Sequence, residues 1–377
     1  MTPAAIAVVE PQMHNLFHAP FNAALLHAVV LAYPELRVSF RARPEHAAAV
    51  RGILERNCPA IVSAIEWRGM TQRSDGSLAA RWCSNSRMFS EVLNAGERVL
   101  FCSISRMQLL QLKRHMKPNQ EVRAVLHGDL DRIEGPVTDR FPMSLFALQK
   151  VLRGRQPRGL RYVLLSDSIR RAIPAQFAPA MQNACVIDHP YHFPQVLPAP
   201  PGEVVFGIFG NCGDGRLLER VARAVRAAAP HIGFRLVGFL GDRAAVERLS
   251  PLVEGTGTLP ISADAFLQGA RAVTYALWLS KPDAFRLRAS GTFMDALAFG
   301  KPLVYTANEF IDPYHALAPG IGTRCETIDD VPAAVVAVAR AHREAEYREA
   351  QRAIVNLRVR FAPESLAPRL GSCLDFD

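Results

Sequence analysis

Short runs rich in β-branched and aromatic residues alternate with segments of helical period along most of the chain. In the first half, the strand-like runs cover residues 6–9, 37–40, 99–103, 122–126 and 162–165. The helical segments between them cover residues 21–32, 46–55, 107–115 and 143–152. This alternation is typical of βαβ units, in which helices cover both faces of a parallel sheet. The first half therefore predicts one doubly wound α/β domain.

A proline-rich stretch interrupts this alternation in the middle of the chain. It carries prolines at positions 190, 194, 198, 200 and 201, a density that neither a helix nor a central strand tolerates. Beyond it, strand-like runs resume at residues 204–209, 234–239, 273–279 and 303–305, between helical segments at 216–228, 263–269 and 292–299. We therefore predict an α/β protein of two Rossmann-like, doubly wound domains that face each other across a cleft. The predicted boundaries are residues 1–190, a linker at 191–202, and residues 203–377.

Composition excludes several other classes of protein. Hydrophobic residues make up 49% and charged residues 21% of the 377 residues, a globular balance that excludes wholesale disorder. The excess of 44 − 35 = 9 positive charges favours anionic partners, but the charges are spread along the chain, so nucleic-acid binding is not expected. Seven scattered cysteines without a C-x-x-C pair argue against a disulfide framework and a structural zinc site, and favour a reducing cytoplasm. No apolar stretch reaches the roughly 18 residues of a membrane span, so any membrane contact would be peripheral.

A glycine-rich loop after the strand at 204–209 is the first candidate binding site. It reads Gly207-Ile-Phe-Gly210-Asn-Cys-Gly213-Asp-Gly215-Arg216 and leads into a helix. Gly210 and Gly213 would let the backbone approach a phosphate, and the helix N-terminus carries a partial positive charge that favours an anion. The loop matches neither the G-x-G-x-x-G fingerprint nor the P-loop pattern, so no dinucleotide cofactor is expected. The structural alternative is a glycine-rich turn without a ligand.

A second candidate loop precedes the predicted helix at 292–299. Arg286 and Arg288 stand in it, and either could supply positive charge to a bound diphosphate. Three consecutive residues could offer backbone N–H groups and hydroxyls to that diphosphate: Ser290, Gly291 and Thr292. Asp295 has a structural alternative, because it lies three residues after Thr292 and could close a capping box.

The sequence from about residue 204 onward resembles the donor-binding domain of GT-B fold glycosyltransferases that use nucleotide sugars. Their E-A-x-A-x-G-K-P-V segment corresponds to Asp295-Ala-Leu-Ala-Phe-Gly300-Lys301-Pro302-Leu-Val304. The resemblance implies that Asp295 holds the ribose hydroxyls, that residues 290–292 hold the diphosphate, and that Arg216 is a further phosphate partner. It implies a nucleotide-sugar substrate and no cofactor or metal. Retaining members carry a Glu-x7-Glu pair, whereas Leu287 stands at the first glutamate position here, so the stereochemical course stays open.

The first domain should then hold the acceptor. His127 and Asp129 follow the strand-like run at 122–126, and many GT-B members similarly place a histidine at such a strand end. A histidine there could accept a proton or hydrogen-bond a sugar hydroxyl, and Asp129 could orient it or act as the base. The structural alternative is a histidine at a turn. Glu10 and His14, after the first strand, are the next candidates for the base.

The leading hypothesis is a glycosyltransferase that moves a sugar from a nucleotide diphosphate to a hydroxyl of a glycan, a lipid-linked or a small-molecule acceptor. Polysaccharide biosynthesis in the cytoplasm would suit this activity. A nucleotide-sugar epimerase would use the same phosphate loops, but it would turn over the donor without an acceptor. A non-catalytic nucleotide-sugar-binding or scaffold protein is the non-enzyme alternative, and Leu287 is its main support.

Overall fold

The computed structural model describes residues 5–71, 76–134, 137, 140–195, 197 and 202–374. The chain divides into two compact units. Unit 1 comprises residues 1–192, 287–289 and 360–377, and unit 2 comprises residues 193–286 and 290–359. This division differs from the predicted boundaries at residues 287–289 and 360–377, which group with the first unit instead of the second.

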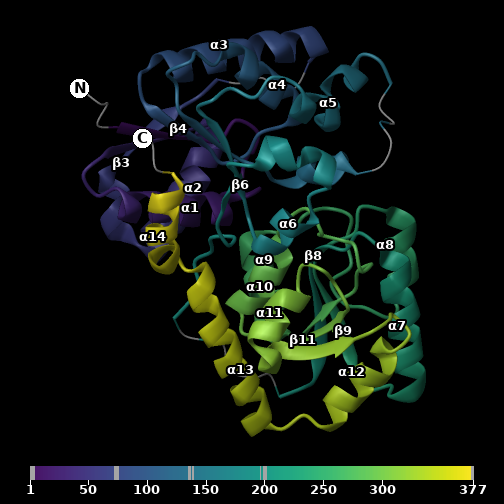
Figure 1. Ribbon diagram of the computed structural model, residues 1–377. Helices are drawn as coiled ribbons and strands as arrows, with labels where there is room; N and C mark the ends of the chain where they lie inside the picture. Colours follow the sequence, from purple (N-terminus) through teal and green to yellow (C-terminus); the bar gives the residue numbers. More distant parts are fainter. Residues whose placement is uncertain are drawn as a thin grey trace. The chain divides into compact units, whose positions relative to one another are not determined.

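Unit 1 is built on a seven-stranded sheet of order β3-β2-β1-β4-β5-β6-β7, whose paired strands are parallel. The strands are β1 (Ala5–Val9), β2 (Arg37–Ala42), β3 (Ile65–Gly69), β4 (Arg98–Phe101), β5 (Val122–Val125), β6 (Leu160–Leu164) and β7 (Cys185–Val186). The α-helices are α1 (Ala19–Ala32), α2 (Pro44–Asn57), α3 (Leu78–Asn94), α4 (Arg106–His115), α5 (Leu148–Arg153), α6 (Asp167–Ala172) and α14 (Pro363–Cys373). Short 3-10 helices are η1 (Pro59–Ala64), η2 (Gly128–Ile133), η3 (Met143–Phe146) and η4 (Ala175–Met181). Figure 1 labels the α-helices of this unit and the strands β3, β4 and β6.

Unit 2 is built on a five-stranded parallel sheet of order β12-β11-β10-β8-β9. The strands are β8 (Val205–Asn211), β9 (Gly233–Phe239), β10 (Tyr275–Trp278), β11 (Leu303–Thr306) and β12 (Gly322–Cys325). The α-helices are α7 (Gly215–Ala228), α8 (Arg243–Leu249), α9 (Ala263–Ala272), α10 (Gly291–Ala298), α11 (Asp312–Leu317), α12 (Val331–Arg340) and α13 (Glu344–Arg358). The 3-10 helix η5 (Pro319–Ile321) precedes β12, and η6 (Val359–Phe361) follows α13. Two Rossmann-like sheets confirm the predicted α/β class.

The predicted strands with continuous apolar runs are confirmed, because parallel central strands are buried on both faces. β1 is an example, since all five of its residues are buried. α1 is apolar over nearly its whole surface and is largely buried as well. The predicted helix at 143–152 is instead broken at Ala147, which separates η3 from α5. In the described part of the chain, no helix is long and apolar enough to span a bilayer.

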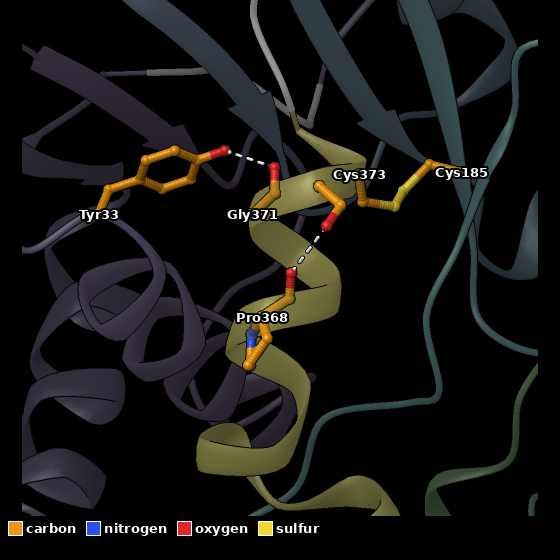
Figure 2. Close-up of a disulfide and its surroundings, with 6 residues drawn as sticks. Tyr33, Cys185, Pro368, Gly371 and Cys373 are labelled. Atoms are coloured by element: carbon orange, nitrogen blue, oxygen red, sulfur yellow. Dashed lines mark hydrogen bonds between the residues drawn. A yellow bond between two sulfur atoms is a disulfide. The ribbon is translucent and has the colours of Figure 1, made fainter.

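The carboxyl-terminal helix α14 is fastened to unit 1 by polar and covalent links. The buried Asp188 carboxylate pairs with Arg360 at 2.8 Å and with Arg369 at 3.2 Å. The Tyr33 hydroxyl donates a hydrogen bond to the Gly371 carbonyl at 3.0 Å, as Figure 2 shows. These links explain why residues 360–374 group with unit 1 and not with unit 2.

A disulfide between Cys185 in β7 and Cys373 in α14 joins the same two regions (Figure 2). The two Cα atoms are 5.4 Å apart, although 188 positions separate the cysteines in sequence. No disulfide framework was expected from the sequence. The structure corrects this expectation, because it contains the bond between Cys185 and Cys373. Spacing could not reveal it, because the pairing depends on how the end of the chain returns to the first sheet.

Candidate functional site

The predicted donor loops of unit 2 border the point where the strand order of its sheet reverses. From β8 the chain passes through α7 to β9 on one side, and then through α9 to β10 on the other side. In open α/β sheets, ligands bind at the carboxyl ends of the strands beside such a reversal. The loops that follow β8 and β10 hold the predicted donor residues, so the topology gathers them at one sheet edge.

Gly210, near the end of β8, and Thr292, in the first turn of α10, lie in direct contact. Gly210 has a φ of 73°, a left-handed conformation that favours glycine. A Cβ atom at this position would collide with Cγ2 of Thr292. Gly213, three residues later, has open space around it. Of the two predicted glycines, Gly210 is therefore the one that the local geometry requires.

α10 is held at both ends, which fixes the direction of its N-terminus. The buried Ser290 is the N-cap; its hydroxyl accepts a hydrogen bond from the Phe293 N–H at 3.3 Å and lies 3.0 Å from the Thr292 hydroxyl. At the other end, the buried guanidinium of Arg358 donates to the carbonyls of Leu297 and Ala298, each at 2.8 Å. The first N–H groups of a helix lack partners within the helix and attract anions. Gly291, the first helical residue, is exposed and can present this end of α10 to a ligand.

α7 offers a weaker anion site than its glycine-rich loop predicts. Asp214 is its N-cap, and the carboxylate accepts hydrogen bonds from the N–H groups of Arg216 and Leu217 at 3.1 and 3.2 Å. A carboxylate already occupies the position that a phosphate would take at this helix. The exposed side chain of Arg216 is still able to contact a ligand. Burial raises the pKa of the nearby Cys212 thiol to about 11, so this cysteine stays protonated and is a poor nucleophile.

The two predicted arginines have different surroundings. Arg286 pairs with Glu309 at 3.2 Å. Arg288 groups with unit 1, as does the buried Leu287, and it pairs there with Asp131 at 3.1 Å. Each of the two arginines therefore has a carboxylate partner within its own unit.

Asp295 does not close a capping box, so that structural alternative is wrong. Ser290 is the N-cap, which makes Phe293 the third helical residue, and a capping box needs a polar side chain at that position. Asp295 lies two residues further along, partly buried in α10. Its place after the helix start is compatible with the ribose role that the resemblance implies.

Asn308 is a supporting residue that the sequence did not reveal. Its side-chain amide donates to the Ser280 hydroxyl at 3.2 Å and to the Ala284 carbonyl at 2.7 Å, and its oxygen accepts from the Phe310 N–H at 3.0 Å. These bonds brace the loop between β10 and α10. Phe285 in this loop has a φ of 64°, an uncommon conformation for a bulky residue that surrounding contacts must maintain.

In unit 1, a buried carboxylate organises the loops after β1 and β4, where the strand order of the larger sheet reverses. Glu10 is fully buried and accepts hydrogen bonds from the Gln12 N–H at 2.9 Å, the Asn22 amide at 3.1 Å and the Ser103 hydroxyl at 2.5 Å. The Asn22 amide also reaches Nε2 of the buried His46 at 2.8 Å. Four such bonds, with that of Met13 N–H at 3.1 Å, suit a structural carboxylate better than a free base.

His127 lies in a cluster of aromatic rings within unit 1. Its ring centroid is 4.7 Å from that of His18, 4.5 Å from that of Phe21 and 6.0 Å from that of His189. Burial, and then the charges of His18 and His189, hold the pKa of His127 well below its usual range. Burial likewise lowers the pKa of His189 to about 3. Three neutral imidazoles therefore share this cluster near neutral pH, since the pKa of His18 is lowered by burial too.

Nε2 of His127 and Nδ1 of His18 are buried and lack a hydrogen-bond partner among the residues that the structure describes. Such atoms are costly unless a ligand or water satisfies them. His18 also has a φ of 58°, and strained residues cluster at functional sites. His18 and His189 were not among the predicted site residues, because their proximity to His127 depends on three separate segments of the chain.

Asp129 has other partners than His127. Its carboxylate accepts a hydrogen bond from the Arg106 N–H at 2.9 Å and pairs with Arg132 at 3.4 Å. The bond from Arg106 fastens η2 to the start of α4, whereas the pair with Arg132 lies within η2. In this geometry, Asp129 supports the segment that carries His127 rather than orienting the imidazole directly.

No protein-family model matches the chain, and no curated protein matches its sequence. Solved structures do resemble it. HepE of Anabaena, in complex with UDP and glucose, is 15% identical with a TM-score of 0.65 over 98% of this chain and 99% of that chain. WaaG, a glycosyltransferase involved in lipopolysaccharide biosynthesis, is 15% identical with a TM-score of 0.57 over 96% and 98%.

A mutant of S. aureus TarM, in complex with fondaparinux, alpha-GlcNAc-glycerol and UDP, is 11% identical with a TM-score of 0.54 over 78% of this chain. The match spans 59% of the length of that protein. At such identities, the likeness establishes the fold. The chain thus has the GT-B fold of nucleotide-sugar glycosyltransferases, built from two Rossmann-like units.

Proposed function

We propose that this protein is a glycosyltransferase that binds a nucleotide diphosphate sugar in unit 2 and transfers the sugar to an acceptor hydroxyl. The observation that carries the proposal is the contact of Gly210 with Thr292 beside the exposed start of α10. It offers a backbone surface and helix N–H groups at the sheet edge where ligands of such folds bind. UDP is the first nucleotide to test, because the structures of HepE and TarM contain it.

Within this proposal, unit 2 stabilises the departing diphosphate. The N-terminus of α10 and the Ser290 and Thr292 hydroxyls would interact with the phosphate oxygens as negative charge develops there. Arg216 would add a positive charge, and Asp295 would bind the ribose. Because the protein's own dipoles and a guanidinium supply this stabilisation, the proposed mechanism requires no divalent metal.

Unit 1 would bind the acceptor, with His127 as the contact residue. An imidazole whose pKa lies well below its usual range is neutral at physiological pH but is a weak base. We therefore assign its unpartnered Nε2 a hydrogen bond with a sugar hydroxyl, and not the role of the general base that accepts the acceptor's proton. Asp129 would act as a positioning residue, through η2. Acceptor class, polysaccharide biosynthesis, cytoplasmic location and peripheral membrane contact stay predictions.

Thermal shift with UDP, GDP, ADP and dTDP sugars tests the donor half of the proposal. A ligand that binds only the native state raises its stability, so one nucleotide family should raise the melting temperature. Arg216→Ala should weaken diphosphate binding by roughly ten-fold to a hundred-fold, because a hydrogen bond to a charged group contributes about 1.5–3 kcal/mol. Arg223→Ala is the matched control, since Arg223 lies on the same helix and pairs with Glu219 at 3.0 Å. Equal affinities of the two variants would contradict the proposed site.

A transfer assay on the same preparations tests the catalytic half. His127→Gln should lower turnover by roughly 10²-fold or more while nucleotide affinity changes little. His115→Gln, a histidine of α4 bound to the Gln111 carbonyl, is its control. Donor turnover without an acceptor would favour the epimerase, and donor binding without any turnover would favour the non-catalytic binding protein.

A further inference from the structure

Three potential metal ligands from distant segments of unit 1 converge at one place outside the candidate site. His27 lies in α1, Cys58 is the residue at which α2 ends and η1 begins, and His192 follows β7. Their ligand atoms all lie within 4.8 Å of one another. Nδ1 of His27 is 3.0 Å from Nε2 of His192, and Sγ of Cys58 is 3.7 Å from the same Nε2.

From this convergence we propose that His27, Cys58 and His192 bind a zinc-like divalent cation. Zn²⁺ is bound tetrahedrally by imidazole nitrogen and thiolate sulfur at about 2.0–2.3 Å, which separates two nitrogens by roughly 3.3 Å and a nitrogen from a sulfur by roughly 3.6 Å. The observed 3.0 and 3.7 Å are close to both values. The third pair, Nδ1 of His27 and Sγ of Cys58, lies within 4.8 Å, and a bound cation would draw these two atoms to the same tetrahedral separation.

The surroundings suit a cation with two imidazole ligands and one thiolate. Burial lowers the pKa of both histidines, that of His192 to about 4, so their nitrogens carry free lone pairs near neutral pH. Burial, and then the charge of Glu364 on α14, raise the pKa of the Cys58 thiol to about 11, so the cation itself must displace the thiol proton. The same carboxylate also acts by its charge on His27. Three protein ligands leave a fourth position, which a water molecule can take. His27 is buried, whereas Cys58 and His192 are partly exposed, so the ion can enter from their side.

A cation here would brace unit 1. It would link α1, the junction of α2 with η1, and the segment through which the chain leaves unit 1. Binding converts the Cys58 thiol to a thiolate and releases its proton to solvent, because a thiolate is the metal-binding form. Sequence spacing gave no sign of this site, since none of its ligands is adjacent to another in the chain. The alternative is a hydrogen bond between two neutral imidazoles beside a free thiol.

Cobalt binding distinguishes these possibilities, because Co²⁺ takes zinc sites and absorbs light when a thiolate coordinates it. The full chain, freed of metal with a chelator and then dialysed, is titrated with Co²⁺ and afterwards with Zn²⁺. We expect a thiolate-to-cobalt absorption band that saturates at about one ion per chain and is displaced by Zn²⁺. Cys58→Ser should abolish the band, whereas Cys83→Ser, which removes an exposed cysteine, should keep it. His27→Gln and His192→Gln should each weaken the affinity by about 100-fold or more.

Absence of the band in the wild-type chain, or its survival in Cys58→Ser, would overturn the proposal. If a variant fails to fold, the wild-type chain provides a second measurement. Peptide mapping after alkylation should show that Zn²⁺ slows modification of Cys58 and leaves that of Cys83 unchanged. Equal effects of Zn²⁺ on the two cysteines would indicate adventitious binding only and would also reject the site.

Discussion

Replacing Gly210 by alanine should destabilise the donor loops of unit 2. Two separate effects contribute, backbone strain and a steric collision. The residue has a φ of 73°, and a left-handed conformation costs an L-residue with a Cβ about 1–2 kcal/mol. The new Cβ would also collide with Cγ2 of Thr292, and overpacking of this kind costs about 1–3 kcal/mol. Together they predict a loss of about 2–5 kcal/mol in the local free energy of unfolding.

Two further variants isolate these contributions. Gly213→Ala is the matched control, because a Cβ there meets open space and its φ is outside the left-handed region. Thr292→Ser removes the methyl group that the new Cβ would strike and keeps the hydroxyl that lies 3.0 Å from Ser290. In the Thr292→Ser background, Gly210→Ala should therefore cost only about 1–2 kcal/mol, the backbone part. A double-mutant cycle should give a coupling of about 1–3 kcal/mol between the two positions.

Hydrogen exchange reports this effect where a global melting curve does not, since a protein of two units need not unfold in one step. The amides of β8 and α10 should exchange faster in Gly210→Ala, and those of β1 in unit 1 should be unchanged. UDP affinity should fall in the same variant if the donor proposal is right. Equal exchange in Gly210→Ala and Gly213→Ala, or no recovery with Thr292→Ser, would refute the argument.

Three other perturbations test unit 1. Without reductant, the denatured chain should show five free thiols, and it should show seven after reduction, because Cys185 and Cys373 are paired. Seven free thiols in both conditions would contradict the disulfide and favour the reducing cytoplasm expected from the sequence. Asp188→Asn should lower the stability of unit 1 by about 1–3 kcal/mol in urea titrations, because it removes the buried charge that holds Arg360 and Arg369. In chelator-containing buffer, stability should fall as pH drops from about 6.5 toward 4, by up to about 1.4 kcal/mol per pH unit for each of His127 and His189. The folded-state pKa of both lies below the unfolded value, so the unfolded chain binds more protons in that range; a flat profile would place these histidines in contact with water.

The sequence predicted the central strands and the edge strand β9, but it missed the edge strands β3 and β12, for a physical reason. Central parallel strands such as β1 are buried on both faces and therefore read as unbroken apolar runs. The edge strands β3 and β12 are partly exposed and carry polar residues, as in Ile65-Glu-Trp-Arg-Gly69. α3 was also missed, because its polar residues obscure the helical period, although its N-cap Ser77 is a recognisable start signal.

The site residues also differ in how well the sequence predicts them. Features that depend on neighbouring residues are predictable, whereas contacts between distant parts of the chain are not. The helix start beside Ser290 and the glycine-rich segment around Gly210 are local features, since each depends on a few consecutive residues, and both segments were singled out from the sequence. The contacts of Glu10 with Ser103 and of His127 with His18 join positions that are far apart in the chain. The order of strands in the sheet brings those pairs together, and that order cannot be derived from one sequence.

The segment that suggested the family illustrates how a motif can report the fold more directly than the chemistry. Gly300 has a φ of 60°, and its N–H donates to the Leu297 carbonyl at 2.9 Å, while the Lys301 N–H donates to the Ala296 carbonyl at 2.9 Å. These two bonds form a Schellman motif, which ends α10. The fully buried Lys301 amine donates to the Val273 carbonyl, and burial lowers its pKa to about 8, so it packs the interior and is not available to a phosphate. Glycine and lysine in this motif therefore fix where α10 ends, and any chemistry of the segment must come from residues at its start.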